Sequence, residues 1–182
     1  MSKIKLFIVT FLSTVAVLVL AIYLNREKLS EATPKLTELS SQIFLSSQLH
    51  PKAIPYLRSQ GIKTIVDIRP DGEASDQPTA AEIKKAANSA ELDFHYIPVP
   101  HDTIPESAVQ DLTSALSGAR SPTLLYCRTG RRAVRLLALA EATRSNGPSN
   151  ESIFEMVHAA GFTAEDLRET IAHKISNRSN PK

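Results

Sequence analysis

A strand, a short loop and a helix follow one another around the only cysteine of this 182-residue chain. The apolar run Thr123–Tyr126 leads into Cys127, and a helix-like pattern, Ala133–Ala140, starts where the loop ends. A thiol is an effective nucleophile only as the thiolate, and cationic side chains together with a helix N-terminus favour that form. Backbone N–H groups in such a loop can also surround a tetrahedral anion. The segment therefore predicts a nucleophile and an anion site between a strand and a helix.

A lone cysteine is more often a small buried hydrophobic residue than a nucleophile. The loop after Cys127 changes that expectation because it holds three arginines, Arg128, Arg131 and Arg132. Their guanidinium groups repel one another unless an anion lies among them. Gly130 suits a backbone with positive φ or a close approach, and Thr129 suits a hydrogen bond to the sulfur or a cap of the helix.

Apolar and β-branched runs alternate with helix-like segments through the rest of the chain. This order predicts an α/β domain over residues 42–178, with a mostly parallel sheet flanked by helices. Ligands of such folds lie at the carboxyl ends of the strands, where Cys127 is expected. The expected strands are 43–45, 63–68, 94–99 and 123–126, and the expected helices are 51–60, 78–90, 105–116, 133–144, 152–160 and 164–175.

The segment Leu6–Leu24 is apolar and uncharged. A helix of this length would reach about 28 Å, enough to cross a bilayer core. A cleaved signal peptide is the alternative, but residues 21–25 offer no small-x-small cleavage site. We expect a membrane anchor over 1–25 and a juxtamembrane linker over 26–41. The short basic N-terminal tail favours a single-pass protein of a bacterial inner membrane with its domain outside the cytoplasm, although basic residues flank both sides.

Composition excludes several other classes. The 21 basic and 19 acidic residues give a formal net charge of only +2, which argues against a nucleic-acid partner. One cysteine excludes an internal disulfide, and the five histidines lack ligand spacing, so we expect neither a metal nor another cofactor.

The sequence resembles the phosphatase-like domain of the beta-lactamase hydrolase-like proteins, a bacterial relative of the dual-specificity phosphatases. The resemblance extends over about 43–175 and implies the cysteine-phosphatase α/β fold. It also implies hydrolysis of a phosphoprotein or a small phosphate monoester through a cysteinyl-phosphate intermediate. The segments that carry it are Leu45–Leu49, Gly61–Glu73, Tyr96–Val99 and Tyr126–Arg132.

The resemblance implies roles for individual residues. Cys127 is the expected nucleophile, Arg132 the bidentate phosphate clamp and Asp102 the general acid, for which an N-cap or turn role before Pro105 is the alternative. The loop residues complete the phosphate-binding set: Arg128, Thr129, Gly130 and Arg131. A nearby charged turn is expected to form a structural ion-pair cluster in which Arg69 could also contact substrate; its residues are Asp67, Arg69, Asp71 and Glu73.

One departure leaves the reaction open. Cysteine-dependent phosphatases have one more residue between the cysteine and the phosphate-binding arginine, and that position is Ala133 here. The tighter loop ending at Arg132 is similar to that of rhodanese sulfurtransferases, which carry a persulfide. A Cys127 persulfide enzyme and a non-catalytic anion-binding module are therefore alternatives. Asp102 favours the phosphatase, because sulfur transfer to a thiolate needs no such acid.

Overall fold

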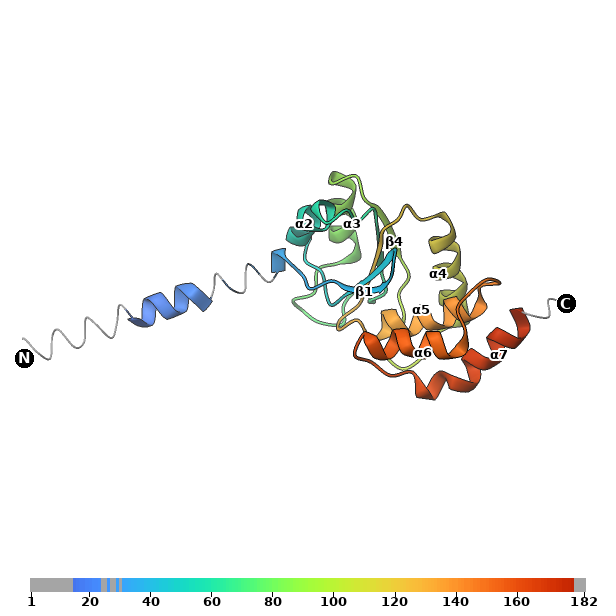
Figure 1. Cartoon of the computed structure of the whole chain (residues 1–182). Helices are drawn as coiled ribbons and strands as arrows, with labels where there is room; N and C mark the ends of the chain where they lie inside the picture. The colour runs from blue at the N-terminus through green and yellow to red at the C-terminus, as the bar shows by residue number, and fades with distance from the viewer. Residues whose placement is uncertain (1–14, 24–25, 27–28, 30, 179–182) are drawn as a thin grey trace, which may run out of the picture.

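A five-stranded sheet forms the centre of the computed structural model, which describes residues 15–23, 26, 29 and 31–178 (Figure 1). The strand order is β1-β2-β5-β3-β4. Strands β2, β5, β3 and β4 are parallel, whereas β1 is antiparallel to β2. The mostly parallel α/β fold predicted from the sequence is thus confirmed. The strands are β1 (Thr37–Ser40), β2 (Ile43–Ser46), β3 (Thr64–Asp67), β4 (Asp93–Tyr96) and β5 (Thr123–Tyr126).

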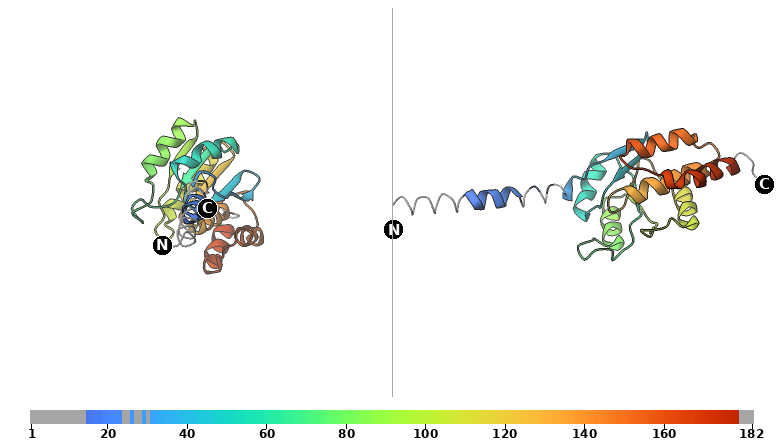
Figure 2. Two further views of the ribbon diagram at one scale, coloured as in Figure 1. Left: turned by 90° about the vertical axis from the view of Figure 1, so that its left-hand side faces the viewer. Right: turned by 90° about the horizontal axis from the view of Figure 1, so that it is seen from below.

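Helices cover both faces of this sheet (Figures 1 and 2). One face carries the 3-10 turn η1 (Pro51–Ala53) with α2 (Ile54–Ser59) and α3 (Ala80–Ser89). The other face carries four helices and the 3-10 turn η2. These are α4 (Glu106–Gly118), α5 (Arg131–Thr143), α6 (Asn150–Ala159), η2 (Glu165–Leu167) and α7 (Arg168–Arg178).

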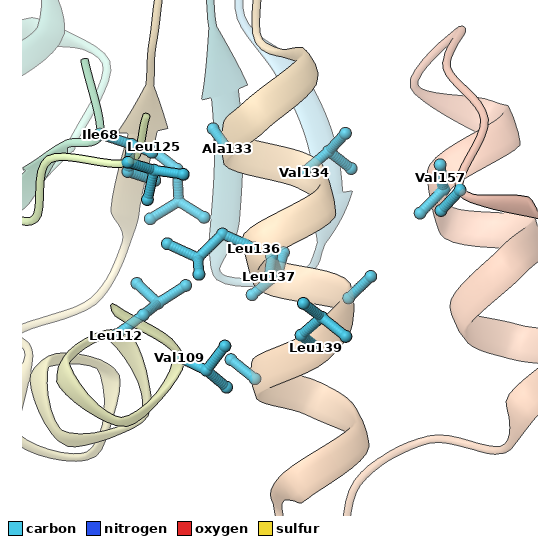
Figure 3. Packing of buried hydrophobic residues seen from close by; sticks show 14 of the residues in the cluster. Ile68, Val109, Leu112, Leu125, Ala133, Val134, Leu136, Leu137, Leu139 and Val157 are labelled. Carbon is cyan, nitrogen blue, oxygen red and sulfur yellow. The ribbon is translucent and has the colours of Figure 1, made fainter. Parts of the chain in front are cut away.

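Helix α5 is the central helix of the second face. Its residues 132–140 are all buried, and it packs against β5, α4, α6 and α7. Figure 3 shows Leu136 facing Val109 and Leu112 of α4, while Val134 points toward Val157 of α6. Apart from Arg132 and Arg135, these buried residues are apolar, and each buried leucine stabilises the fold by about 1.5–3 kcal/mol. The N-terminus of α5 is consequently held in place by the core.

Strand β1 lies within residues 26–41, the segment expected to be a linker. Its side chains alternate between half-buried and exposed, as expected at a sheet edge. Strand β4 ends at Tyr96, earlier than expected, because Pro98 has no N–H for a ladder hydrogen bond. The N–H of Val99 still donates to the Ile68 carbonyl at 3.0 Å, so the chain after β4 follows β3 to the carboxyl end of the sheet.

The prediction of a single-pass membrane protein at a bacterial inner membrane is wrong. Among the described residues, no helix combines the length and the apolar character that crossing a bilayer requires. The structure describes a helical segment over residues 15–23 within the expected anchor. The remaining residues of the apolar run, 6–14 and 24, lie outside the described part of the chain.

Candidate active site

The loop after β5 wraps around the sulfur of Cys127. The cysteine is buried, with 1% of its surface exposed, and the Gly130 N–H donates to its Sγ at 3.2 Å. Gly130 is the N-cap of α5 with φ of 96°, and a Cβ there would lie 3.2 Å from the Leu45 side chain. The left-handed backbone therefore requires glycine at this position, and the close approach of Leu45 favours it further. The predicted strand–loop–helix unit is formed, and the thiol lies beside the helix N-terminus.

The other loop residues predicted to bind phosphate are exposed, in contrast to Gly130. Arg128, Thr129 and Arg131 are exposed, and the Thr129 hydroxyl accepts the Arg131 N–H at 3.4 Å. The Arg128 carbonyl accepts the N–H of Gln48, at 3.2 Å. The loop that follows β2 thus braces the loop that follows β5.

Arg132 is almost fully enclosed, with 8% of its surface exposed. Its NH1 group donates to Glu73 Oε1 at 2.6 Å and to the Val99 carbonyl at 2.7 Å, and its NH2 group donates to Glu73 Oε2 at 2.7 Å. Burial opposes the charge of Arg132, but the hydrogen bond to Glu73 and the nearby Cys127 sulfur raise its pKa above the ordinary value. The guanidinium is therefore a permanent cation next to the thiol.

Asp102 lies in an exposed bend between β4 and α4. It does not cap α4, because the N-cap of that helix is Pro105. Within the described part of the chain, no hydrogen bond or ion pair involves its carboxylate. Asp102 thus lies in a turn before Pro105, and its carboxylate is exposed to solvent.

Glu73 comes from the charged turn that follows β3. The Arg69 Nε donates to Glu73 Oε2 at 3.0 Å, and Arg69 NH1 donates to Gln48 Oε1 at 2.6 Å. The hydrogen bonds from Arg132 first, and then the one from Arg69, hold the pKa of Glu73 below its usual value. Of the expected ion-pair cluster, Arg69 and Glu73 form a pair, and Arg132 joins it. Asp71 instead accepts the N–H of Ala80 at the start of α3, at 2.8 Å. The sequence offered one signal for the contact between Glu73 and Arg132: Glu73 follows β3, and the carboxyl end of β3 lies beside that of β5.

Asp67 is the last residue of β3 and, like Arg69, is buried. It is 2% exposed, pairs in register with Tyr126 of β5, and its Oδ1 accepts the Arg69 N–H at 3.0 Å. Burial raises the pKa of Asp67 to about 6, and the opposing effects of the Tyr126 hydroxyl and the Arg69 N–H are smaller. The carboxyl group of Asp67 therefore belongs to the core of the first face and not to the loop around Cys127.

We expect Asp67→Asn to remove the contribution that the titration of Asp67 makes to the pH dependence of the free energy of unfolding. The folded protein holds the Asp67 proton more tightly than the unfolded chain, so this contribution is present below pH ~4 and lost as the pH rises through about 6. Asparagine never ionises. Between pH 4 and pH 7 the stability of the variant relative to the wild type, measured as the free energy of unfolding, should therefore rise by about 2 kcal/mol. Urea titrations of both proteins at several pH values measure this, and a constant difference over that interval would contradict it.

A cleft of about 200 Å³ adjoins the loop and is lined by Thr129, Ser46, Ser47 and Lys35, among others. A larger cleft of about 510 Å³ lies at the opposite end of the strands, near Ile43 and Thr123, and none of the candidate site residues lines it. Neither Cys127 nor Arg132 lines either cleft. We therefore place the chemistry at the loop itself, where the thiol and the N-terminus of α5 lie together. Among the described residues, no group of three or more metal-binding side chains is present.

Comparisons with known proteins point to one family. The family described as "Beta-lactamase hydrolase-like protein, phosphatase-like domain" matches residues 35–144. A beta-lactamase hydrolase-like protein of Agrobacterium fabrum is 33% identical over 108 residues, which cover 59% of this chain and 25% of that protein. The chain thus spans only 25–30% of the length of the curated relatives it matches.

Solved structures agree with this match. A candidate phosphatase from Neisseria meningitidis is 32% identical, with a TM-score of 0.65, covering 75% of this chain and 96% of that one. The core catalytic domain of the PP-IP phosphatase SIW14 of S. cerevisiae is 19% identical, with a TM-score of 0.56, covering 79% of this chain and 87% of that one. The second likeness concerns the fold alone. Together these findings confirm the resemblance and the phosphatase-like fold expected from the sequence.

Proposed function

This chain belongs to the family of the beta-lactamase hydrolase-like protein phosphatase-like domain, and we propose that it hydrolyses phosphate monoesters through a cysteinyl-phosphate intermediate on Cys127. One observation carries the proposal. A single loop sets the Cys127 sulfur beside the N-terminus of α5, with the buried cation of Arg132 next to it. A thiolate nucleophile and a site for a phosphoryl dianion need this combination. The substrate would be a phosphoprotein or a small phosphoester.

The proposed reaction has two steps. The Cys127 thiolate attacks phosphorus, the bond to the ester oxygen breaks, and the leaving oxygen takes a proton from Asp102. Water then attacks the cysteinyl phosphate, gives a proton to Asp102, and releases inorganic phosphate and the thiolate. The N–H groups of residues 128–132, with the helix dipole, and the guanidinium of Arg132 would stabilise the phosphoryl oxygens in both steps.

Asp102 would matter most for esters whose leaving group is a poor one. Asp102→Asn should slow hydrolysis of a phenyl phosphate by on the order of a hundredfold, because that leaving oxygen needs the proton. A 4-nitrophenyl phosphate, which leaves readily as the anion, should lose much less. Steady-state turnover of both esters measures the difference. An equal loss for both esters, or no loss for either, would remove Asp102 from this role.

Sulfur transfer is the second candidate, favoured by the loop of four residues between Cys127 and Arg132. A shorter ring of N–H groups encloses a smaller space, which suits a persulfide sulfur better than a phosphoryl group. Parallel assays separate the two reactions: one with an aryl phosphate, and one with thiosulfate and cyanide. We expect hydrolysis of the phosphate. A protein inert toward aryl phosphates but able to form thiocyanate would be a sulfurtransferase, and one inert in both assays would be a binding module.

A further inference from the structure

Arg132 has more hydrogen-bond donors than its present contacts use. A guanidinium carries five N–H groups, which form two forks: one between NH1 and NH2, and one between Nε and NH2. Glu73 takes the first fork through both carboxylate oxygens, and the Val99 carbonyl takes the second hydrogen of NH1. Within the described chain, no oxygen atom accepts from Nε or from the remaining hydrogen of NH2.

The second fork is the one that Glu73 and Val99 leave for the reacting group. Arg132 lies within reach of the Cys127 sulfur, which is the atom that would carry the phosphoryl group. Rotation of the guanidinium is restricted, because three hydrogen bonds to two different chain segments fix one edge of it. A fork held in one orientation binds two oxygens of a phosphoryl group without a further loss of side-chain freedom.

A second arginine, Arg69, fixes the position of Glu73. Arg69, 4% exposed, donates to Glu73 Oε2 and to the side chain of Gln48, and the N–H of Gln48 donates to the Arg128 carbonyl of the loop. The segments after β2, β3 and β5 therefore meet in one chain of contacts. Because these three strands are neighbours in the sheet, their carboxyl ends bring the partners together.

We propose that Glu73 is a positioning residue for the reaction: it holds the NH1–NH2 fork of Arg132, so that the Nε–NH2 fork stays directed at the phosphoryl oxygens on Cys127. The inference rests on the proposed phosphatase function. It assigns Glu73 an effect that passes through Arg132 and not through contact with substrate. An alternative reading, in which Glu73 competes with substrate for Arg132, makes the opposite prediction for turnover.

Glu73→Gln tests this inference, because glutamine keeps the size but offers only one acceptor oxygen to the fork. We expect kcat for an aryl phosphate to fall on the order of tenfold or more, the scale of a misplaced catalytic group. Glu73→Asp, which keeps the charge but loses reach, should also lower kcat. Asp166→Asn is the matched control, since Asp166 forms the same bidentate pair with Arg135 on α5. It should leave turnover within about twofold of the wild-type rate.

A double-mutant cycle distinguishes positioning from a general loss of structure. If Glu73 acts through Arg132, then Glu73→Gln should have little further effect in the Arg132→Lys background. Fully multiplicative effects, an unchanged kcat or an increased kcat in Glu73→Gln would each overturn the proposal. Calorimetric binding of tungstate, a tetrahedral oxyanion, is measured alongside. Wild-type protein that binds no tungstate and hydrolyses no ester would refute the phosphatase function and this inference together, whereas an active wild type with an unaffected Glu73→Gln would refute the inference alone.

Discussion

Replacing Arg132 with lysine is expected to slow turnover of an aryl phosphate by on the order of a hundredfold or more, the scale observed when a donor to the developing charge is lost. Lysine retains a positive charge but cannot reproduce the planar fork. In this protein the loss is compounded, because the same guanidinium also binds Glu73 and the Val99 carbonyl. A single ammonium group cannot satisfy those partners and a phosphoryl dianion at once.

Arg135→Lys is the control for this experiment. Arg135 lies one turn further along α5, is 9% exposed, and donates to Asp166 and to the Thr163 carbonyl. Its substitution removes a buried fork of the same kind at a distance from Cys127. We expect Arg135→Lys to lower stability while turnover stays near the wild-type rate. Near-normal turnover by Arg132→Lys would remove Arg132 from the role of phosphate clamp.

Much of the fold could be predicted because its signals are local. Each of three signals depends only on residues that are close in sequence. They are the β-branched run that forms β3, the apolar run before Cys127, and the glycine at the start of α5. Strand β1 was missed because the sequence Thr37–Ser40 has no apolar alternation, and it becomes a strand only by pairing with β2. The membrane anchor was inferred from the apolar run 6–24 and its flanking residues, and the described helices do not support it.

The candidate site could be predicted only in part, for the same reason. Cys127, Gly130 and Arg132 lie in one short segment, so their pattern was visible in the sequence. The contact between Glu73 and Arg132 joins residues 59 positions apart and depends on the neighbouring positions of β3 and β5. Asp102 remains a proposal, since its place in an exposed bend gives it access to a substrate but no partner in the described chain.

Replacing Cys127 with serine is expected to reduce hydrolysis of aryl phosphates to background, a loss on the order of ten-thousandfold or more, because a serine hydroxyl in this loop has no base to activate it. Serine is close to cysteine in size, so the loop and its contact with Gly130 should be retained. The variant should therefore bind tungstate about as tightly as the wild type does. Loss of tungstate binding together with activity would indicate that the loop, and not the nucleophile alone, had been destroyed.

The covalent intermediate tests the reaction most directly. The wild-type protein is mixed with a radiolabelled aryl phosphate, denatured within the first turnover and digested, and the labelled peptide is identified by mass spectrometry. We predict phosphate on the sulfur of Cys127 in the wild type and none in Cys127→Ser. Hydrolysis of the ester without phosphate on Cys127, or a persulfide there as the only adduct after thiosulfate treatment, would contradict the proposed mechanism.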